Sequence, residues 1–518
     1  SSSSYVNNVD LAPWWGYYAS YYCYYDNSNE CSIRTKTIPF NGAGTDVSAD
    51  INTPTIWDLE ASPIRITPAN GDYITVNADL TIESGVTVEI AENKGIVFNG
   101  ACNKLTVNGT ADLPVNITDL GTTSAKALGM AFTNGCTTSG GTDDRHTFTH
   151  TNFENMSVAI SAGSAWGSTP RYNGNVGDFE MSDMTFDNVD KAISHGSGQG
   201  TSFTMENFAI TNAADACMDL PQDAVVDLRF GSMDECNTNW NDWGGAIVNY
   251  PGSNGGSLTM ENVTITDARA NGISVDYDAL WLSNVSLTIP DLTNDAGRPG
   301  TNWNPDGGVY HDADSTSGST FYGYGLTIDG YYRGIYTQAT DSVHMEEIAG
   351  TGLEGFISVI PAGASSSVTG ATGTDAVFDD ITMSGSSTSD SQLYLERTRP
   401  DTINDVSFTT SGSGPGLYLA GNSPDSGTVT VTGYEGAHMR AVGCGWTVEA
   451  STVSIDTDST AVISNCASSS SSNRVTVSGF DLDYTGTGSS TGASYAQNSI
   501  LTMADGTIDS DFSNIGSA

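Results

Sequence analysis

The sequence has 518 residues, with 17 basic and 61 acidic side chains and a formal net charge of −44. Such a charge argues against nucleic acid or an anionic membrane surface as a partner, because like charges repel. No run of about 18 apolar residues occurs, so no segment is predicted to span a membrane. With 38% hydrophobic residues, the chain can form a folded core.

The composition favours short strands joined by tight turns. Only 15% of the residues are charged, and 58 are glycine. Lysine is nearly absent and Asp far outnumbers Glu, so two strong helix formers are scarce, whereas Gly, Asn, Asp and Ser suit turns. The sequence therefore predicts an all-β fold.

The cysteines and the first residues indicate an extracellular or cell-surface protein. The chain begins with four serines instead of an initiator Met and a basic, apolar leader. This is expected of a mature secreted chain or of a trimmed one. An even cysteine count in an acidic, Lys-poor chain predicts disulfides formed in an oxidising compartment. The alternative is a metal site, but no C-x-x-C pair occurs. The predicted couples are Cys23 with Cys31, Cys102 with Cys136, Cys217 with Cys236, and Cys444 with Cys466.

Five sequons permit N-glycosylation without indicating it, because a chain rich in Asn, Ser and Thr contains such triplets by chance. Their acceptors are Asn108, Asn116, Asn155, Asn262 and Asn284.

Residues 1–55 form an aromatic segment that differs from the rest of the chain. One interpretation is an N-terminal cap, because a stack of strands exposes unpaired edges at its ends. The other is an adhesive arm that docks on a neighbouring subunit, since Tyr and Trp are favoured interface anchors. The candidate assembly residues are Trp14, Trp15, Tyr17, Tyr18, Tyr21 and Tyr22.

Residues 56–120 contain short β-type runs with a distinctive order. Leu-Thr-Ile-Glu-Ser-Gly-Val-Thr-Val at 80–88 is followed by Leu-Thr-Val-Asn-Gly-Thr-Ala at 105–111 and Leu-Pro-Val-Asn-Ile-Thr at 113–118. This order resembles the opening coils of secreted and cell-surface right-handed parallel β-helix proteins of bacteria and archaea, which share the pectate-lyase-like superfold. The resemblance implies a β-helix over 56–518, but this superfold carries lyases, hydrolases, adhesins and structural proteins alike.

A repeat follows from about residue 145 onward and predicts the same fold independently. Its copies include Phe-Thr-Met-Glu-Asn-Phe-Ala-Ile at 203–210, Leu-Thr-Met-Glu-Asn-Val-Thr-Ile at 258–265 and Leu-Trp-Leu-Ser-Asn-Val-Ser-Leu at 280–287. Copies start 22 to 26 residues apart (258 to 280, 377 to 403), which is shorter than helical repeats or propeller blades. About three short strands per repeat, stacked coil on coil, give a right-handed parallel β-helix of about fifteen coils. An Ig-like sandwich array would instead need modules of about 100 residues.

The residue before the second strand of each repeat is repeatedly Asn, Asp or Gly. Asn207, Asn262 and Asn284 occupy this position in the three copies quoted above. A sharp bend between strands requires a left-handed backbone, which these residue types tolerate best. We therefore expect a bend there, with Asn side chains able to hydrogen-bond from coil to coil.

Residues 290–318 interrupt the repeats and are predicted to form a protruding loop. Asp-x-Asp pairs recur in the chain, and residues i and i+2 of a strand share a face, so such a pair can supply two hard oxygen ligands. The best candidate calcium ligands are Asp306, Asp312 and Asp314 in this segment. Apart from calcium, no cofactor is expected.

The sequence predicts no catalytic site. Glycosidases need paired carboxylates at a fixed separation, but Asp143–Asp144 and Asp379–Asp380 are isolated pairs in different coils. The six histidines match no metal motif.

The leading expectation is a non-catalytic extracellular structural or adhesive protein, a self-associating subunit of a surface layer, sheath or filament. Calcium or another cation would screen its acidic charge. The alternative is a carbohydrate-active β-helix, either a lyase- or hydrolase-like enzyme or a glycan-binding protein. Under this alternative, Trp281 and Trp303 could stack on sugars, and Trp281 is predicted to face outward because it alternates with Leu280 and Leu282.

Overall fold

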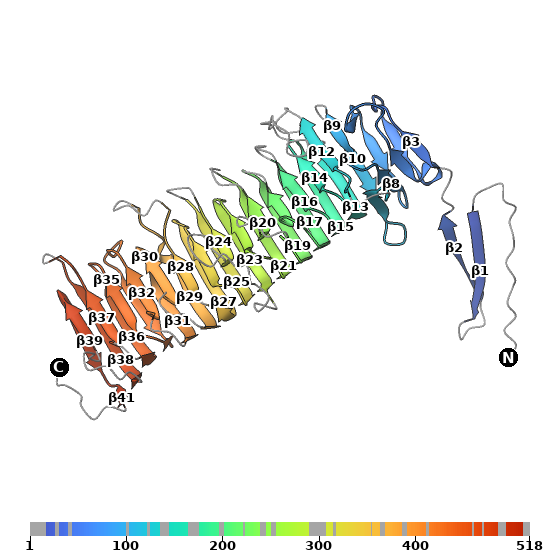
Figure 1. Cartoon of the computed structure of the whole chain (residues 1–518). Helices are drawn as coiled ribbons and strands as arrows, with labels where there is room; N and C mark the ends of the chain where they lie inside the picture. The colour runs from blue at the N-terminus through green and yellow to red at the C-terminus, as the bar shows by residue number, and fades with distance from the viewer. Residues whose placement is uncertain are drawn as a thin grey trace.

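Each repeat folds into one coil of a right-handed parallel β-helix, and the coils stack into a rod in the computed structural model (Figure 1). The predicted all-β fold and its architecture are thereby confirmed. For residues 17–25 and 31–39 the structure describes the backbone but not the side chains. The structure describes residues 17–25, 31–39, 44–99, 103–121, 125–134, 145–163, 176–195, 201–220, 223–238, 245–249, 255–289, 307–313, 318–353, 355–362, 368–385, 391–410, 414–457, 460–468, 471–484 and 494–510.

The larger sheet, here called the long-strand sheet, contains 23 strands among the described residues, and all of its recorded pairings are parallel. These strands are β3 (Thr45–Val47), β4 (Thr55–Trp57), β5 (Ile64–Ile66), β7 (Leu80–Ile82), β8 (Thr87–Ile90), β10 (Leu105–Asn108), β11 (Val115–Asp119), β13 (Arg145–Glu154), β15 (Asp178–Asp187), β17 (Ser202–Thr211), β19 (Val225–Asp234), β21 (Ser257–Thr266), β23 (Ala279–Thr288), β25 (Thr320–Asp329), β27 (Ser342–Leu353), β29 (Thr372–Gly385), β31 (Arg399–Thr410), β33 (Thr428–Thr432), β34 (Glu435–Gly436), β36 (Thr447–Thr457), β38 (Asn473–Tyr484), β40 (Ser499–Ala504) and β41 (Thr507–Ser510).

The second sheet, here called the short-strand sheet, holds 16 described strands. With about 4.8 Å between neighbours, its fifteen spacings give a stack roughly 70 Å long. The strands are β6 (Tyr73–Val76), β9 (Gly95–Asn99), β12 (Gly129–Asn134), β14 (Val158–Ala162), β16 (Lys191–His195), β18 (Met218–Leu220), β20 (Gly245–Asn249), β22 (Asn271–Val275), β24 (Gly307–His311), β26 (Arg333–Thr337), β28 (Gly355–Val359), β30 (Leu393–Glu396), β32 (Leu417–Ala420), β35 (Met439–Val442), β37 (Val462–Asn465) and β39 (Ser494–Gln497).

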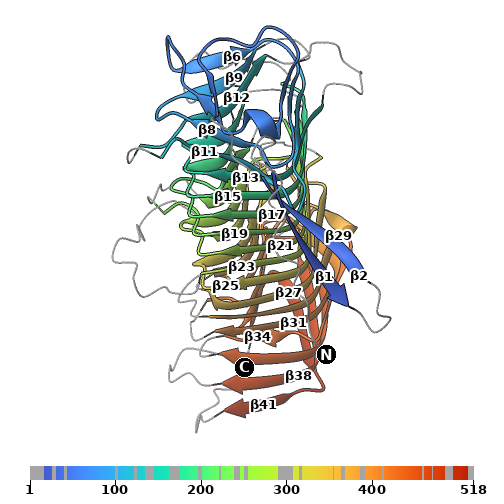
Figure 2. The same ribbon diagram turned by 90° about the vertical axis from the view of Figure 1, so that its right-hand side faces the viewer.

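The coils stack one on another along the length of the rod (Figure 2). One apolar core, from Ile51 to Leu482, runs through these coils. Strand alternation places every second side chain inward, and the parallel register aligns these side chains from coil to coil. In the short-strand sheet, Ile160 pairs with Met130 on one side and with Ile193 on the other, and all three are fully buried. The core is thus a set of continuous ladders.

The long strands bend sharply at the predicted position. Asn207, Asn262 and Asn284 have φ values of 55°, 55° and 52° and lie in the middle of β17, β21 and β23. The left-handed backbone makes two consecutive side chains point outward. In β17, for example, Glu206 and Asn207 are both exposed, between the buried Met205 and Phe208. Each ten-residue strand therefore forms two faces of the coil.

The N-terminal region differs in part from the sequence prediction. β1 (Tyr17–Tyr25) and β2 (Cys31–Pro39) pair antiparallel in a sheet of their own. The predicted boundary at residue 56 is too late, because β3 already pairs in parallel with β5 and Ile51 bridges to Val76. A short 3-10 helix, η1 (Leu59–Ala61), follows, and its N-cap Asp58 accepts a hydrogen bond from the Ala61 N–H at 3.0 Å.

The segment 290–318 is not one loop as predicted, because Gly307–His311 forms β24 inside the short-strand sheet. Val309 is fully buried and pairs with Ile273 and Ile335. Glycine is needed at position 308, where a Cβ would lie 2.6 Å from the Ile328 side chain. The glycines that suggested a loop thus serve close packing in a strand.

Candidate binding groove on the long-strand sheet

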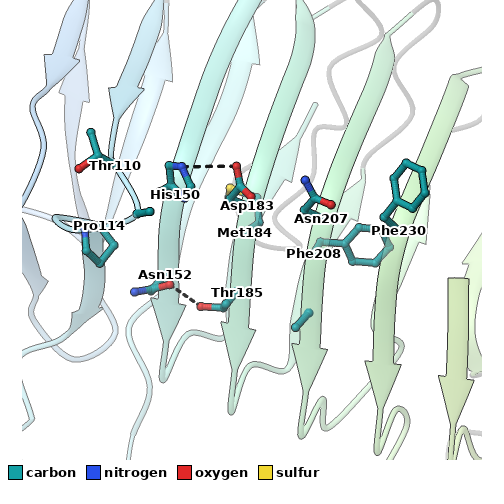
Figure 3. A pocket seen from close by; sticks show the side chains of 12 residues that line it. Thr110, Pro114, His150, Asn152, Asp183, Met184, Thr185, Asn207, Phe208 and Phe230 are labelled. Carbon is teal, nitrogen blue, oxygen red and sulfur yellow. Dashed lines mark hydrogen bonds and ion pairs between the residues drawn. The ribbon is translucent and has the colours of Figure 1, made fainter. Parts of the chain in front are cut away.

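A groove of about 540 Å³ lies on the outer face of the long-strand sheet. It crosses β13, β15, β17 and β19 and is bordered by Thr110 and Pro114 (Figure 3). Its polar lining consists of His150, Asn152, Asp183, Thr185 and Asn207, and Phe230 lies at one end. The groove is open to solvent along its length.

The bends of successive long strands lie side by side, and we call the row of residues at these bends the bend column. This row explains why the polar side chains gather in the groove. His150, Asp183, Asn207 and Phe230 each occupy the bend of their strand, with φ values of 42°, 55°, 55° and 53°. The register pairs their flanking residues coil by coil, so the four side chains stand in one row. Because the bend turns two successive side chains outward, this row lines the groove.

Polar contacts between coils fix the orientation of the lining. His150 Nε2 lies 3.5 Å from Asp183 Oδ2, and each side chain is about one-third exposed. Thr185 Oγ1 donates to Asn152 Oδ1 at 2.6 Å, and Asn152 Nδ2 donates to Asn116 Oδ1 at 2.9 Å. The groove therefore presents hydrogen-bonding groups whose positions are set before any ligand arrives.

Phe230 is the bulkiest apolar residue among the described members of the bend column. It is 49% exposed and adopts a left-handed backbone, which costs a bulky residue about 1–2 kcal/mol. Its register neighbours in the column, Asn207 and Asn262, are of the type that tolerates this conformation. The following residue, Gly231, lies against the ring of Phe208 so closely that a Cβ would collide with it. An exposed aromatic ring is thus held at a position that disfavours it.

The sequence interpretation missed His150 and Phe230, although a signal was present. Aligning the repeats on the bend shows Asn, Asp or Gly in most coils, and His150, Phe230, Glu347 and Thr452 in the others. Departures of this kind mark positions where a side chain serves something other than the bend.

The groove lining combines polar side chains with an aromatic ring. Asp183 is the one carboxylate among the residues that line it, whereas glycoside hydrolysis requires two. Among the described residues, no group of three potential metal ligands is found. Amides, a hydroxyl and an imidazole–carboxylate pair beside an aromatic ring fit a ligand with many hydroxyl groups.

Of the predicted calcium ligands, Asp306 and Asp314 lie outside the described residues. Asp312 follows β24, and its Oδ2 accepts a hydrogen bond from the Tyr310 hydroxyl at 3.4 Å. The calcium site stays a prediction.

Two of the four predicted disulfides are confirmed, Cys217–Cys236 and Cys444–Cys466. Cys217 precedes β18 and Cys236 follows β19, so this bridge joins neighbouring coils. Such bridges are typical of an oxidising compartment. Cys102 and Cys136 lie outside the described residues, and the side chains of Cys23 and Cys31 are not described.

The predicted assembly residues are not tested. Trp14 and Trp15 lie outside the described residues, and Tyr17, Tyr18, Tyr21 and Tyr22 lie in β1, whose backbone alone is described.

The five sequon asparagines differ in their surroundings. Asn155 Nδ2 donates to Asp119 Oδ1 at 3.2 Å, and Asn262 Nδ2 donates to Glu261 Oε1 at 3.4 Å. Because a glycan is attached at this nitrogen, modification would compete with these bonds. Asn116 accepts from Asn152 and also lies in a strand. Asn108, exposed at the end of β10, is the more accessible acceptor.

The described residues form a right-handed parallel β-helix with a groove on the outer face of the long-strand sheet. Comparisons with known proteins found no matching family model, curated protein or solved structure. Within the described part of the chain, no helix has the length and apolar character needed to cross a membrane.

Proposed function

We propose that this protein is a non-catalytic extracellular adhesive rod that holds saccharide chains in the groove of the long-strand sheet. The observation that carries the proposal is Phe230, an exposed aromatic ring kept in a left-handed backbone next to hydrogen-bonding side chains. A bulky ring that is half exposed and held in a left-handed backbone supports a role in ligand binding rather than in folding. Aromatic rings offer an apolar face on which the C–H face of a sugar ring can stack.

Phe230→Asn tests the proposal, because Asn suits the bend and removes only the ring. We expect the purified chain to bind members of a broad glycan panel and the variant to lose this binding by about tenfold or more. Val225→Ala is the matched control, since Val225 lies on the same strand, is 57% exposed and is not among the groove-lining residues. Unchanged glycan binding by Phe230→Asn, or no binding to any glycan by the unaltered chain, would overturn the proposal.

A second candidate function is that of an assembly subunit in a surface layer, sheath or filament. It is favoured by the β1–β2 hairpin, which forms its own sheet and has no recorded pairing with the described solenoid strands. A two-stranded hairpin that forms a sheet of its own has unpaired strand edges, which a second copy of the chain can pair with. Calcium would promote assembly by screening the charge of −44.

Electron microscopy of the whole chain and of a variant lacking residues 1–39, with calcium and with a chelator, tests this candidate. Filaments or sheets that form with calcium and require the hairpin would support it. Isolated rods under both conditions would exclude it.

A further inference from the structure

A second feature of the long-strand sheet lies beyond the groove. Trp281, Tyr322 and His344 occupy equivalent outward positions of β23, β25 and β27 and are paired in register. The ring centroids of Trp281 and Tyr322 are 5.7 Å apart, and those of Tyr322 and His344 are 4.7 Å apart. We call these three residues the aromatic column. The strands that carry it, β23, β25 and β27, lie in the coils that follow the groove along the rod (Figure 1).

The aromatic column is a surface feature and not part of the core. Trp281 is 51% exposed, as predicted from its alternation with buried Leu280 and Leu282. An indole left half in water gives up the stabilisation that burial would provide. The three rings in register form a continuous strip of aromatic surface across three neighbouring coils.

The surroundings of the column are acidic. In register beside it lie Glu261 and Glu346, and Asp379 continues the same row. His344 Nε2 lies 2.9 Å from Glu346 Oε2, and the Tyr324 hydroxyl hydrogen-bonds to Glu347, which raises the pKa of Tyr324. The five strands β21, β23, β25, β27 and β29 contain no Lys or Arg at all. Arg229 of β19 is the register neighbour of Glu261, and its guanidinium lies 2.8 Å from Asp227 Oδ2, which balances its charge.

This combination selects the charge of a ligand. Carboxylates on strands that contain no Lys or Arg repel an anionic polymer and attract a cationic one. The face of an indole or phenol also attracts ammonium groups. A sugar chain bearing amines satisfies both features, because its rings stack on the column while its ammonium groups meet the carboxylates.

We propose that the aromatic column is a binding site for a saccharide chain that carries free amino groups. This inference deepens the proposed adhesive function by naming a ligand class, but its residues are separate from those of the groove. The expected contacts are stacking on Trp281 and Tyr322, and ion pairs with Glu261 and Glu346.

Titration calorimetry on the full chain tests the proposal by measuring the affinity for three sugar hexamers. The hexamers consist of glucosamine, of N-acetylglucosamine and of galacturonate. We expect the glucosamine hexamer to bind about tenfold more tightly than the acetylated one, and the galacturonate hexamer to bind most weakly. The binding of the amine hexamer should weaken as salt rises.

Variants separate stacking from charge. Trp281→Ala should weaken binding of the glucosamine hexamer about tenfold, whereas Trp281→Phe should stay within about threefold of the unaltered chain. Glu346→Gln should reduce the preference for amine over acetylated hexamer. Ser286→Ala, on the same strand but past the bend, serves as the matched control and should change nothing.

Three outcomes would overturn the inference: equal affinity for all three hexamers, unchanged amine binding in Trp281→Ala, or a change of oligomeric state in Trp281→Ala by light scattering. The last would assign the column to a contact between copies of the chain. Failure here is distinguishable from failure of the groove proposal. Glycan binding that depends on Phe230 and not on Trp281 would keep the groove and reject the column.

Discussion

Asn284 Nδ2 donates a hydrogen bond of 3.3 Å to Asn262 Oδ1 in the preceding coil. Both residues occupy the bend of their strands and both have a left-handed backbone. One residue type thus meets two needs at this position, since Asn tolerates the bend and its amide links adjacent coils. A similar link joins the ends of two neighbouring long strands. Asn188, directly after β15, donates from Nδ2 to Oδ1 of Asn155, directly after β13, at 2.5 Å.

Two substitutions at position 262 separate these contributions. Asn262→Gly keeps the left-handed backbone and loses the amide bond, so we expect a loss of about 1 kcal/mol in unfolding free energy. Asn262→Ala also forces a Cβ into the left-handed region, for a total of about 2 kcal/mol. Hydrogen exchange of β21 and β23 is the suitable measurement, because long repeat arrays need not unfold in one step. Equal losses in the two variants would contradict the assigned strain.

Phe230→Asn should stabilise the rod while it abolishes binding in the groove. The gain, about 1 kcal/mol, arises because Asn adopts the left-handed backbone more readily than Phe, as Asn207 and Asn262 do on either side. Because Phe230 is half exposed, its removal sacrifices little buried area. Thermal melting and hydrogen exchange of β19 would measure the effect, and a destabilised variant would mean that the ring packs for stability.

Two buried histidines should make the rod less stable in mild acid. Burial lowers the pKa of His146 and of His311 to about 4, from an ordinary value of 6.5. Their nitrogens are already occupied: Nε2 of His311 donates to the Tyr277 carbonyl at 2.7 Å, and Nδ1 accepts from the Thr337 hydroxyl at 2.9 Å. Protonation of Nδ1 would remove that acceptor.

The direction follows from which state binds the proton. Below pH 6.5 the unfolded chain protonates these histidines while the folded chain does not, so stability falls as pH drops from about 6.5 to about 4. The loss approaches about 3 kcal/mol for each histidine. Melting curves between pH 7.5 and 4.5 should show a shallower decline for His311→Gln than for the unaltered chain. Parallel declines would refute the assignment.

The bridge between Cys217 and Cys236 should stabilise the coils it joins. It closes a loop of 19 residues, for which the entropy of the unfolded chain predicts about 3 kcal/mol. The double variant Cys217→Ala, Cys236→Ala should therefore open β18 to β20 to hydrogen exchange more readily. The second bridge, Cys444–Cys466, supplies an internal control, since exchange of β35 and β37 should stay unchanged.

Several features of the fold could be predicted from local sequence. The alternation in 258–265 fixes which side chains face inward, and the Asn at its centre fixes the bend. Cysteines that are 19 and 22 residues apart lie about one coil apart, which is why their pairing could be predicted. Local rules failed at 307–311, where glycines that suit a loop instead pack against Ile328.

The sequence by itself determined the coil, because a strand's inward face and a left-handed bend depend on neighbouring residues alone. Only the tertiary structure decided which surface residues meet. His150 and Asp183 are 33 residues apart, whereas Asp183 and Asn207 are 24 apart, yet the three stand in one row. Trp281 and Tyr322 are separated by 41 residues and still stack. Insertions between coils change these separations freely, while backbone hydrogen bonds between parallel strands restore the register and place the side chains side by side.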